Sequence, residues 1–259
     1  MRDRDNAQPF SARPQDLPVK ADLPRLRVEY GKEERLAYLG HLEVLSTVER
    51  SIRRAGLPFS IGNGFARRMR IQFSSALPVG ASSACEYYDL RLTERLDAGE
   101  ALGRLLAASP RALAPRRVAY VDSRLPALEA WLNRVDWSVG LEGGCPADEL
   151  LEAIGEVARR GEVRYRRGEK EKVIDLGRTL AGYSVCEDEA GGMTVGIETR
   201  SGAGVSLRPQ VLVDAAFAAM GRPVPDAPRV RKVRQAHEED GRIVEPFCGS
   251  DAIASSSLF

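Results

Sequence analysis

The order of predicted strands and helices occurs twice along this chain, and that duplication constrains the fold more than any other feature. In the first copy, apolar and polar residues alternate over 26–30, an apolar stripe at helical spacing runs over 42–55, and Gly56 ends that helix. Asp97 is placed to cap a second helix. The remaining strands of this copy are predicted at 57–61, 87–92 and 117–121.

The second copy begins with the apolar segment 137–141 and follows the same order. Pro146 and Pro209 are placed to start its two helices. Further strands are predicted at 162–166, 172–174, 180–186, 193–199 and 230–233. Each copy therefore reads approximately β-α-β-β-α-β, the order of a split βαβ unit. We predict an α+β protein of two tandem ferredoxin-like (βαββαβ) units, with a single larger α+β sheet as the main alternative.

Composition sets the expected domain boundaries. Residues 1–24 are polar and contain several prolines, which predicts a flexible N-terminal arm. The first unit, with a basic glycine loop, is expected over 25–123 and the second over 124–235. The polar and serine-rich stretch 236–259 is expected to be a flexible C-terminal tail.

Charge is balanced overall but clustered locally. The chain of 259 residues carries 38 basic and 37 acidic side chains, so attraction to a polyanion must come from local clusters. Between His41 and Arg70 there are six arginines and two acids, and half of these arginines follow a glycine-bracketed turn. Glycines allow a phosphate to approach the backbone, and guanidinium groups bind phosphate in a bidentate way.

This cluster is the candidate site for RNA or phosphate. We expect its guanidinium groups to converge on one electropositive pocket, with Phe65 stacking on bases. The predicted binding residues are Arg50, Arg54, Gly62, Asn63, Gly64, Phe65, Arg67, Arg68 and Arg70. The alternative is a hairpin tip whose arginines pair with Glu86 or Asp89.

Catalytic and cofactor motifs are sparse. His41, at the start of the first helix, is a weak candidate for a general base, and capping or packing is its alternative role. The four cysteines form no CxxC pair and there are only two histidines, so we predict no metal and no cofactor. No Walker loop is present. A long apolar run is absent too, so we expect a cytoplasmic protein without membrane contact.

Residues 25–93 carry several motifs together. These are Gly40-His41-Leu42-Glu43, the stretch from Glu49 to Pro58, Gly64-Phe65, and Leu77-Pro78-Val79-Gly80. In these motifs the sequence resembles a bacterial family of unknown function, the radical SAM-linked (radical SAM-associated) proteins. The second half is similar at 170–176 and 207–212.

The resemblance implies a companion of a radical SAM protein that is encoded nearby or fused to it. The cluster motif CxxxCxxC of the radical enzyme is absent here. Family members commonly carry an Asn-Pro-His-Pro-like stretch after Gly-Phe, whereas this chain has Ala66-Arg67-Arg68-Met69. The departure removes a histidine and two prolines and adds positive charge.

The leading hypothesis is a non-catalytic accessory protein of a radical SAM enzyme that binds RNA (tRNA or rRNA) or another anionic substrate. One alternative is a metal-independent endoribonuclease, in which His41 and an arginine act on the phosphate. Another is a pure protein-interaction scaffold, in which the arginines meet acidic residues of the partner.

Overall fold

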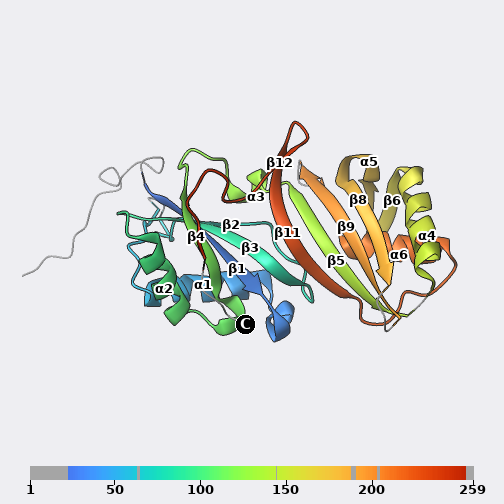
Figure 1. Cartoon of the computed structure of the whole chain (residues 1–259), viewed down its shortest axis with the longest axis horizontal. Coiled ribbons are helices and arrows are strands. Elements are labelled where there is room, and N and C mark those ends of the chain that lie inside the picture. The colour runs from blue at the N-terminus through green and yellow to red at the C-terminus, as the bar shows by residue number, and fades with distance from the viewer. Residues whose placement is uncertain (1–22, 63–64, 144, 188–190, 203–204, 255–259) are drawn as a thin grey trace, which may run out of the picture.

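The computed structural model describes residues 23–62, 65–143, 145–187, 191–202 and 205–254. One mixed sheet of eleven strands runs through both halves of the chain, and a separate two-stranded sheet lies beside it (Figure 1). The predicted α+β class is confirmed. Among the described residues, no helix combines the length and the apolar character that crossing a membrane requires.

In the first half, β1 is the central strand. It lies between β3 and β4 and is antiparallel to both, and the short β2 pairs with β3. The helices α1 and α2 pack on one face of these strands, where Ile52 and Leu105 meet Leu26 and Leu90. The bounds are β1 (Arg25–Lys32), α1 (His41–Arg54), β2 (Ile71–Phe73), β3 (Ser82–Arg91), α2 (Ala98–Ala108) and β4 (Pro115–Val121), with short 3-10 helices at Glu34–Tyr38 and Arg111–Leu113.

The ends of these two helices follow local rules. The Gly40 backbone N–H donates to Glu43 Oε2 at the start of α1, and Gly56 adopts φ +62° just beyond its end. Asp97 caps α2 by accepting a hydrogen bond from the Glu100 backbone N–H, as predicted. The sequence therefore positions both helices within a residue or two.

The second half has the strand order β8-β9-β5-β11, and every neighbouring pair is antiparallel. Its apolar core lies between these strands and the helices α4 and α6, with Val139, Ile154, Val195 and Phe217 fully buried. The bounds are β5 (Arg134–Glu142), α4 (Ala147–Arg160), β6 (Glu162–Arg167), β7 (Lys170–Asp175), α5 (Leu176–Thr179), β8 (Leu180–Glu187), β9 (Gly192–Gly202), β10 (Val205–Ser206), α6 (Pro209–Ala219) and β11 (Arg229–Glu239). The hairpin β6-β7 forms the separate sheet.

The halves join where β11 runs parallel to β3, at Arg231 opposite Ser82 and Lys232 opposite Ser83. Lys232 is buried at this junction, 2.9 Å from Glu86 Oε1 and 5.5 Å from the centre of the Trp137 ring. A buried charge needs such a partner, because its desolvation is costly. The junction is therefore held by a charge pair as well as by backbone hydrogen bonds.

The C-terminal stretch folds back over the first half, so the prediction of a loose tail is wrong for residues 236–254. β11 extends to Glu239 and is followed by β12 (Arg242–Val244), and β13 (Ile253–Ala254) pairs with β4. Figure 1 shows this red segment crossing the first half. Phe247 is buried there with α3 (Leu128–Trp131), because both cover apolar side chains on the face of the sheet opposite α1 and α2.

Two other predictions concern the segment 57–61 and the N-terminal arm. The predicted strand at 57–61 is reduced to isolated bridges of Phe59 with Leu92 and of Ile61 with Met69, since this stretch turns away from the sheet into a hairpin. The expected N-terminal arm falls almost entirely on residues 1–22, which lie outside the described residues.

Candidate functional site

The basic loop is the tip of a hairpin that is anchored on β3. The Arg70 N–H donates to the Ser60 carbonyl (2.8 Å) and the Gly62 N–H to the Arg68 carbonyl (2.8 Å). The stem is tied to the end of β3 on both sides, because Ser60 N–H donates to the Arg91 carbonyl and Arg91 N–H to the Arg70 carbonyl. Backbone hydrogen bonds therefore hold the base of the loop on β3.

The tip presents its side chains to solvent. Phe65 is 110% exposed relative to an extended reference chain, and Arg67 and Arg68 are exposed beside it. Arg67 has φ +41°, in the left-handed region that costs a non-glycine residue free energy. Asn63 and Gly64, which were predicted to belong to the site, lie outside the described residues.

Within the described part of the chain, no carboxylate pairs with Arg67 or Arg68. For Arg67 and Arg68 the alternative pairing with Glu86 or Asp89 is wrong, because Glu86 lies against Lys232 and Asp89 accepts hydrogen bonds from Arg25 and Arg27. The tip arginines are therefore available to a ligand.

Positive charge continues from the tip into the stem. Arg70 is half-buried and lies close enough to Arg91 to affect its ionisation. Burial, followed by the charges of Arg25 and Arg70, lowers the pKa of the Arg91 guanidinium. The buried Asp89 carboxylate opposes this shift and offsets part of the crowding of like charges.

The arginines of α1 form a second patch rather than part of the same pocket. Arg50 donates to Thr47 Oγ1 (3.1 Å) and lines an open groove that includes Leu39, Leu42 and Arg53 but none of the loop residues. Arg54 is exposed at the end of the helix. The expected convergence on one pocket is therefore replaced by two patches, because the helix end and the hairpin tip are separated by the stem.

One contact connects these two patches. The Arg53 guanidinium stacks 5.0 Å from the centre of the Phe59 ring, and Phe59 stands at the start of the hairpin stem. The end of α1 and the base of the hairpin are therefore in contact, and an extended anion could reach both patches where a small one would occupy only one.

His41 does not have the surroundings of a general base. It is the first residue of α1 and is exposed, and its ring contacts the edge of Phe73 at 6.4 Å between centroids. In the described ranges, neither a carboxylate nor a hydrogen-bond partner orients its ring. The contact corresponds to the packing alternative.

A family model matches residues 25–209, which is more than half of the chain. The chain belongs to the DUF2344 family. Its members are described as uncharacterized proteins conserved in bacteria.

Other comparisons with this DUF2344 protein are weaker. No curated protein sequence matches it. A chain in the crystal structure of a Cbf5–Nop10–Gar1 complex is similar, with a TM-score of 0.47 and 13% sequence identity. The similarity covers 91% of this chain and 58% of that one, so this chain spans little more than half the length of the matched chain.

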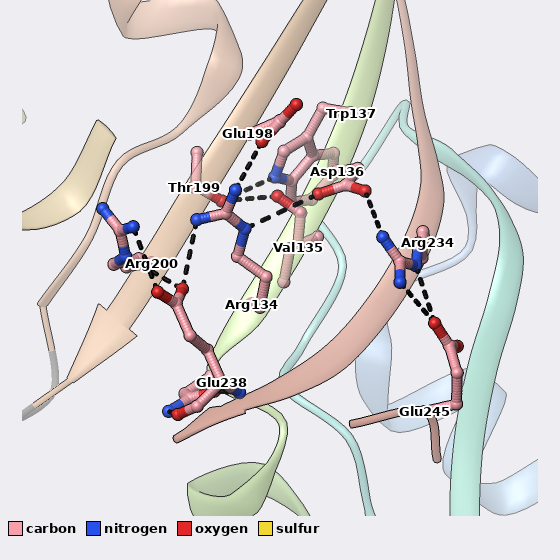
Figure 2. Close-up of polar contacts among 11 residues, drawn as sticks. Arg134, Val135, Asp136, Trp137, Glu198, Thr199, Arg200, Arg234, Glu238 and Glu245 are labelled. Carbon is pink, nitrogen blue, oxygen red and sulfur yellow. Dashed lines mark hydrogen bonds and ion pairs between the residues drawn. The ribbon is translucent and has the colours of Figure 1, made fainter. Parts of the chain in front are cut away.

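The sequence did not reveal a charge network on the second half of this DUF2344 protein. Arg134 contacts Glu198 and Glu238, and Arg200 approaches Glu238 from the other side (Figure 2). Arg234 continues the network toward Asp136 and Glu245. The signal was limited to alternating charges on strands that are far apart in sequence, so the partners could not be assigned.

The pKa values of two carboxyl groups in this network are shifted in opposite directions. Burial, and then the nearby Glu198, raise the pKa of Asp136, which stands directly opposite Glu198 on the neighbouring strand. The hydrogen bond from Arg200 lowers the pKa of Glu238. The arginines of this network are thus matched by acids, in contrast to Arg67 and Arg68.

One of the four thiols is buried, and the described residues form no cluster of metal ligands. Burial raises the pKa of the Cys85 thiol to about 12, which makes the thiolate inaccessible at neutral pH. Groups of three or more histidine, cysteine, aspartate or glutamate side chains that could hold a metal are not found in the part of the chain that the structure describes.

Proposed function

We propose that this DUF2344 protein is a non-catalytic accessory protein that binds RNA through the hairpin tip and the end of α1. The observation that carries the proposal is the contrast in pairing. Arg67 and Arg68 have no acidic partner among the described residues, whereas Arg134, Arg200 and Arg234 are matched by acids. Unmatched guanidinium groups on a braced loop suit phosphate oxygens.

The exposed ring of Phe65 adds a second element. An unpaired base can stack on an aromatic side chain, whereas the bases of a duplex are already stacked on each other. Phe65 beside Arg67 and Arg68 therefore suits a single-stranded or looped segment of a tRNA or rRNA, or another anionic substrate with a flat ring.

The resemblance to radical SAM-linked proteins supplies the rest of the proposal. We infer that the partner is a radical SAM protein encoded nearby, that both act in the cytoplasm, and that this chain presents the substrate. We also infer that the halves are paired ferredoxin-like units. The strand orders β4-β1-β3-β2 and β11-β5-β9-β8, each with two helices on one face, support this inference.

RNA binding is tested by fluorescence anisotropy with a labelled single-stranded RNA over a series of salt concentrations. The double variant Arg67→Ala/Arg68→Ala is expected to bind more weakly and to reduce the log–log salt slope by about 1.4, which is two phosphate contacts on a single strand. The matched control is Arg160→Ala/Arg164→Ala, which removes the same charge from exposed arginines that pair with Glu156 and Glu162. Equal slopes for the two double variants, or no binding by the wild type, would refute the RNA proposal.

The partner is tested separately by co-purification with the radical SAM protein encoded nearby, with and without nuclease treatment. Retention that depends on RNA supports presentation of a substrate. Retention that survives nuclease and the loss of both loop arginines indicates the scaffold alternative instead.

A further inference from the structure

A cavity of about 440 Å³ lies at one end of the second half, far in sequence from the basic hairpin. Its walls come from the end of β7, from α5, from the end of β9, from β10 and from the turn between β11 and β12. A cavity of this size falls within the range of small-molecule sites. The charges around it indicate what kind of molecule it can take.

Arg200 forms part of the wall and is held in place from behind. It donates from Nε and Nη2 to the two carboxylate oxygens of Glu238, and Arg134 contacts the same carboxylate from the opposite side (Figure 2). In the described ranges, Nη1 of Arg200 has no partner. The Arg200 guanidinium is therefore held in one orientation, while its Nη1 stays available to a ligand.

A second arginine on the wall has a free guanidinium. The backbone N–H of Arg178 donates to Asp175 Oδ1, which fixes the first turn of α5, but no described residue pairs with its exposed side chain. Arg178 and Arg200 both line the cavity. Together they can bind one carboxylate with charge-assisted hydrogen bonds.

The remaining wall is acidic and apolar. Asp175 and Asp240 are exposed carboxylates that line the cavity, and Asp240 is held on the β11–β12 turn at φ +49°. Val173 is 51% exposed and Val205 is 46% exposed, which is unusual for valines on strands. The lining therefore offers guanidinium groups, carboxylates and an aliphatic surface in the same cavity.

We propose that this cavity binds a small aliphatic zwitterion, an α-amino acid or a short peptide. Its carboxylate would lie against Arg178 and Arg200, its ammonium group against Asp240 and Asp175, and its side chain against the valines. A plain anion meets repulsion from the three acids of the lining, and a plain amine leaves the free guanidinium groups unmatched. This inference is independent of RNA binding, since none of its residues lies on the hairpin or α1.

The test is isothermal titration of the full chain with four probes that differ in one feature each. L-leucine carries both charges, 4-methylpentanoate lacks the ammonium group, isoamylamine lacks the carboxylate, and leucyl-leucine separates the charges by one further residue. We expect leucine or leucyl-leucine to bind, and both singly charged analogues to bind at least about tenfold more weakly, because each loses a charge-assisted interaction. Equal binding by a singly charged analogue, or no binding by either zwitterion, overturns the proposal.

Variants place the binding in this cavity. Arg178→Gln and Asp240→Asn are expected to weaken zwitterion binding by about tenfold each while leaving the thermal midpoint of the free protein unchanged, because both side chains are exposed. Arg166→Gln is the matched control, because Arg166 is an exposed arginine on β6 that is not among the lining residues. A loss of binding in the control as large as in Arg178→Gln would also overturn the assignment.

Discussion

The two halves of the sheet differ in what covers them. In the first half, β1 is buried along its whole length, and β3 is buried over its last seven residues, from Cys85 to Arg91. In the second half, β5 and β9 alternate between buried residues on the helix face and residues that are at least partly exposed. The cover on the first half comes from α3 and the C-terminal segment. Similar strand arrangements can therefore hold their charges inside the protein or at its surface.

This difference determines how each half satisfies its charges. Arg25 and Arg27 share Asp89, and their remaining donors reach the backbone carbonyls of Leu125, Pro126 and Pro246 in the covering segments. The exposed half pairs side chain with side chain, as in the network of Figure 2. Charges in the covered half depend on the cover, whereas charges in the exposed half also have water.

The largest effect is expected for the carboxylate shared by the two buried arginines. Asp89→Asn leaves two guanidinium groups that are almost inaccessible to solvent without a compensating charge. We expect a loss of about 3–5 kcal/mol in the free energy of unfolding. Urea unfolding with an unchanged m value measures it.

Asp122→Asn is the matched control on the exposed side, because Asp122 pairs with Arg124 in solvent. Its loss is expected to be far smaller than that of Asp89→Asn, because water and salt screen an exposed ion pair. Similar losses for the two variants would mean that the cover does not isolate Asp89 from water.

The next effect tests the cover itself. Phe247 is 7% exposed, packs its ring 5.9 Å from that of Tyr87, and lies under the Arg117 guanidinium. Phe247→Ala is expected to reduce the free energy of unfolding by about 3 kcal/mol through lost burial and the cavity left behind. The half-exposed Ile253, truncated to alanine, serves as the control and should lose much less.

A negligible effect of Phe247→Ala would restore the original expectation of a loose tail. A local pattern does not predict this cover, because 236–259 is polar and serine-rich, and Phe247 has no apolar neighbours at strand spacing. Its burial depends on a site formed by Tyr87, Ala119 and Leu132, which are distant in sequence.

Local patterns predicted the elements of this fold well, because each pattern has its own short-range cause. The apolar stripe of α1, the cap of Asp97 and the alternation of β5 each involve residues within one or two turns. The same alternation in β1 does not reveal that Arg27 is buried, since its partner Asp89 is 62 residues away. Burial of a charged strand face is set by tertiary packing, which a local pattern does not contain.

The candidate site was predicted in the same uneven way. The exposure of Arg67, Arg68 and Phe65 follows from a glycine turn and was expected from the sequence. Whether these arginines have acidic partners depends on where Glu86 and Asp89 point, and both point to other cations. The separation of the α1 patch from the hairpin tip likewise required the path of the stem.

A smaller effect is expected in how the stability of the second half depends on pH, where Glu238 and Asp136 should act in opposite ways. The pKa of Glu238 is lower in the folded protein than in the unfolded chain. Its ionised carboxylate therefore stabilises the fold at any pH above the pKa of the unfolded chain, and this contribution is lost as the pH falls through the folded-state pKa. Glu238→Gln is expected to cost about 1 kcal/mol near pH 7, and the difference from wild type should shrink below about pH 4. Thermal unfolding across pH measures it.

Asp136→Asn is the matched variant with the opposite sign. The pKa of Asp136 is raised, so its ionised form is disfavoured in the folded state, and protonation removes that cost as the pH falls. The variant should be at least as stable as wild type near pH 7 and lose this advantage in acid. Parallel pH profiles for the two variants would show that the network does not separate the carboxylates.

The smallest effect concerns Arg67, which combines a strained backbone with an exposed charge. Because φ is +41°, glycine relieves the backbone strain at position 67 and alanine does not. The free energy of unfolding of Arg67→Gly should therefore be about 0.5–1 kcal/mol higher than that of Arg67→Ala. Both variants lose the guanidinium and should lose RNA affinity equally. A protein that keeps a strained arginine where glycine is more stable retains the side chain for something other than folding. If Arg67→Gly bound RNA as well as wild type, the strain would have to be explained without the ligand.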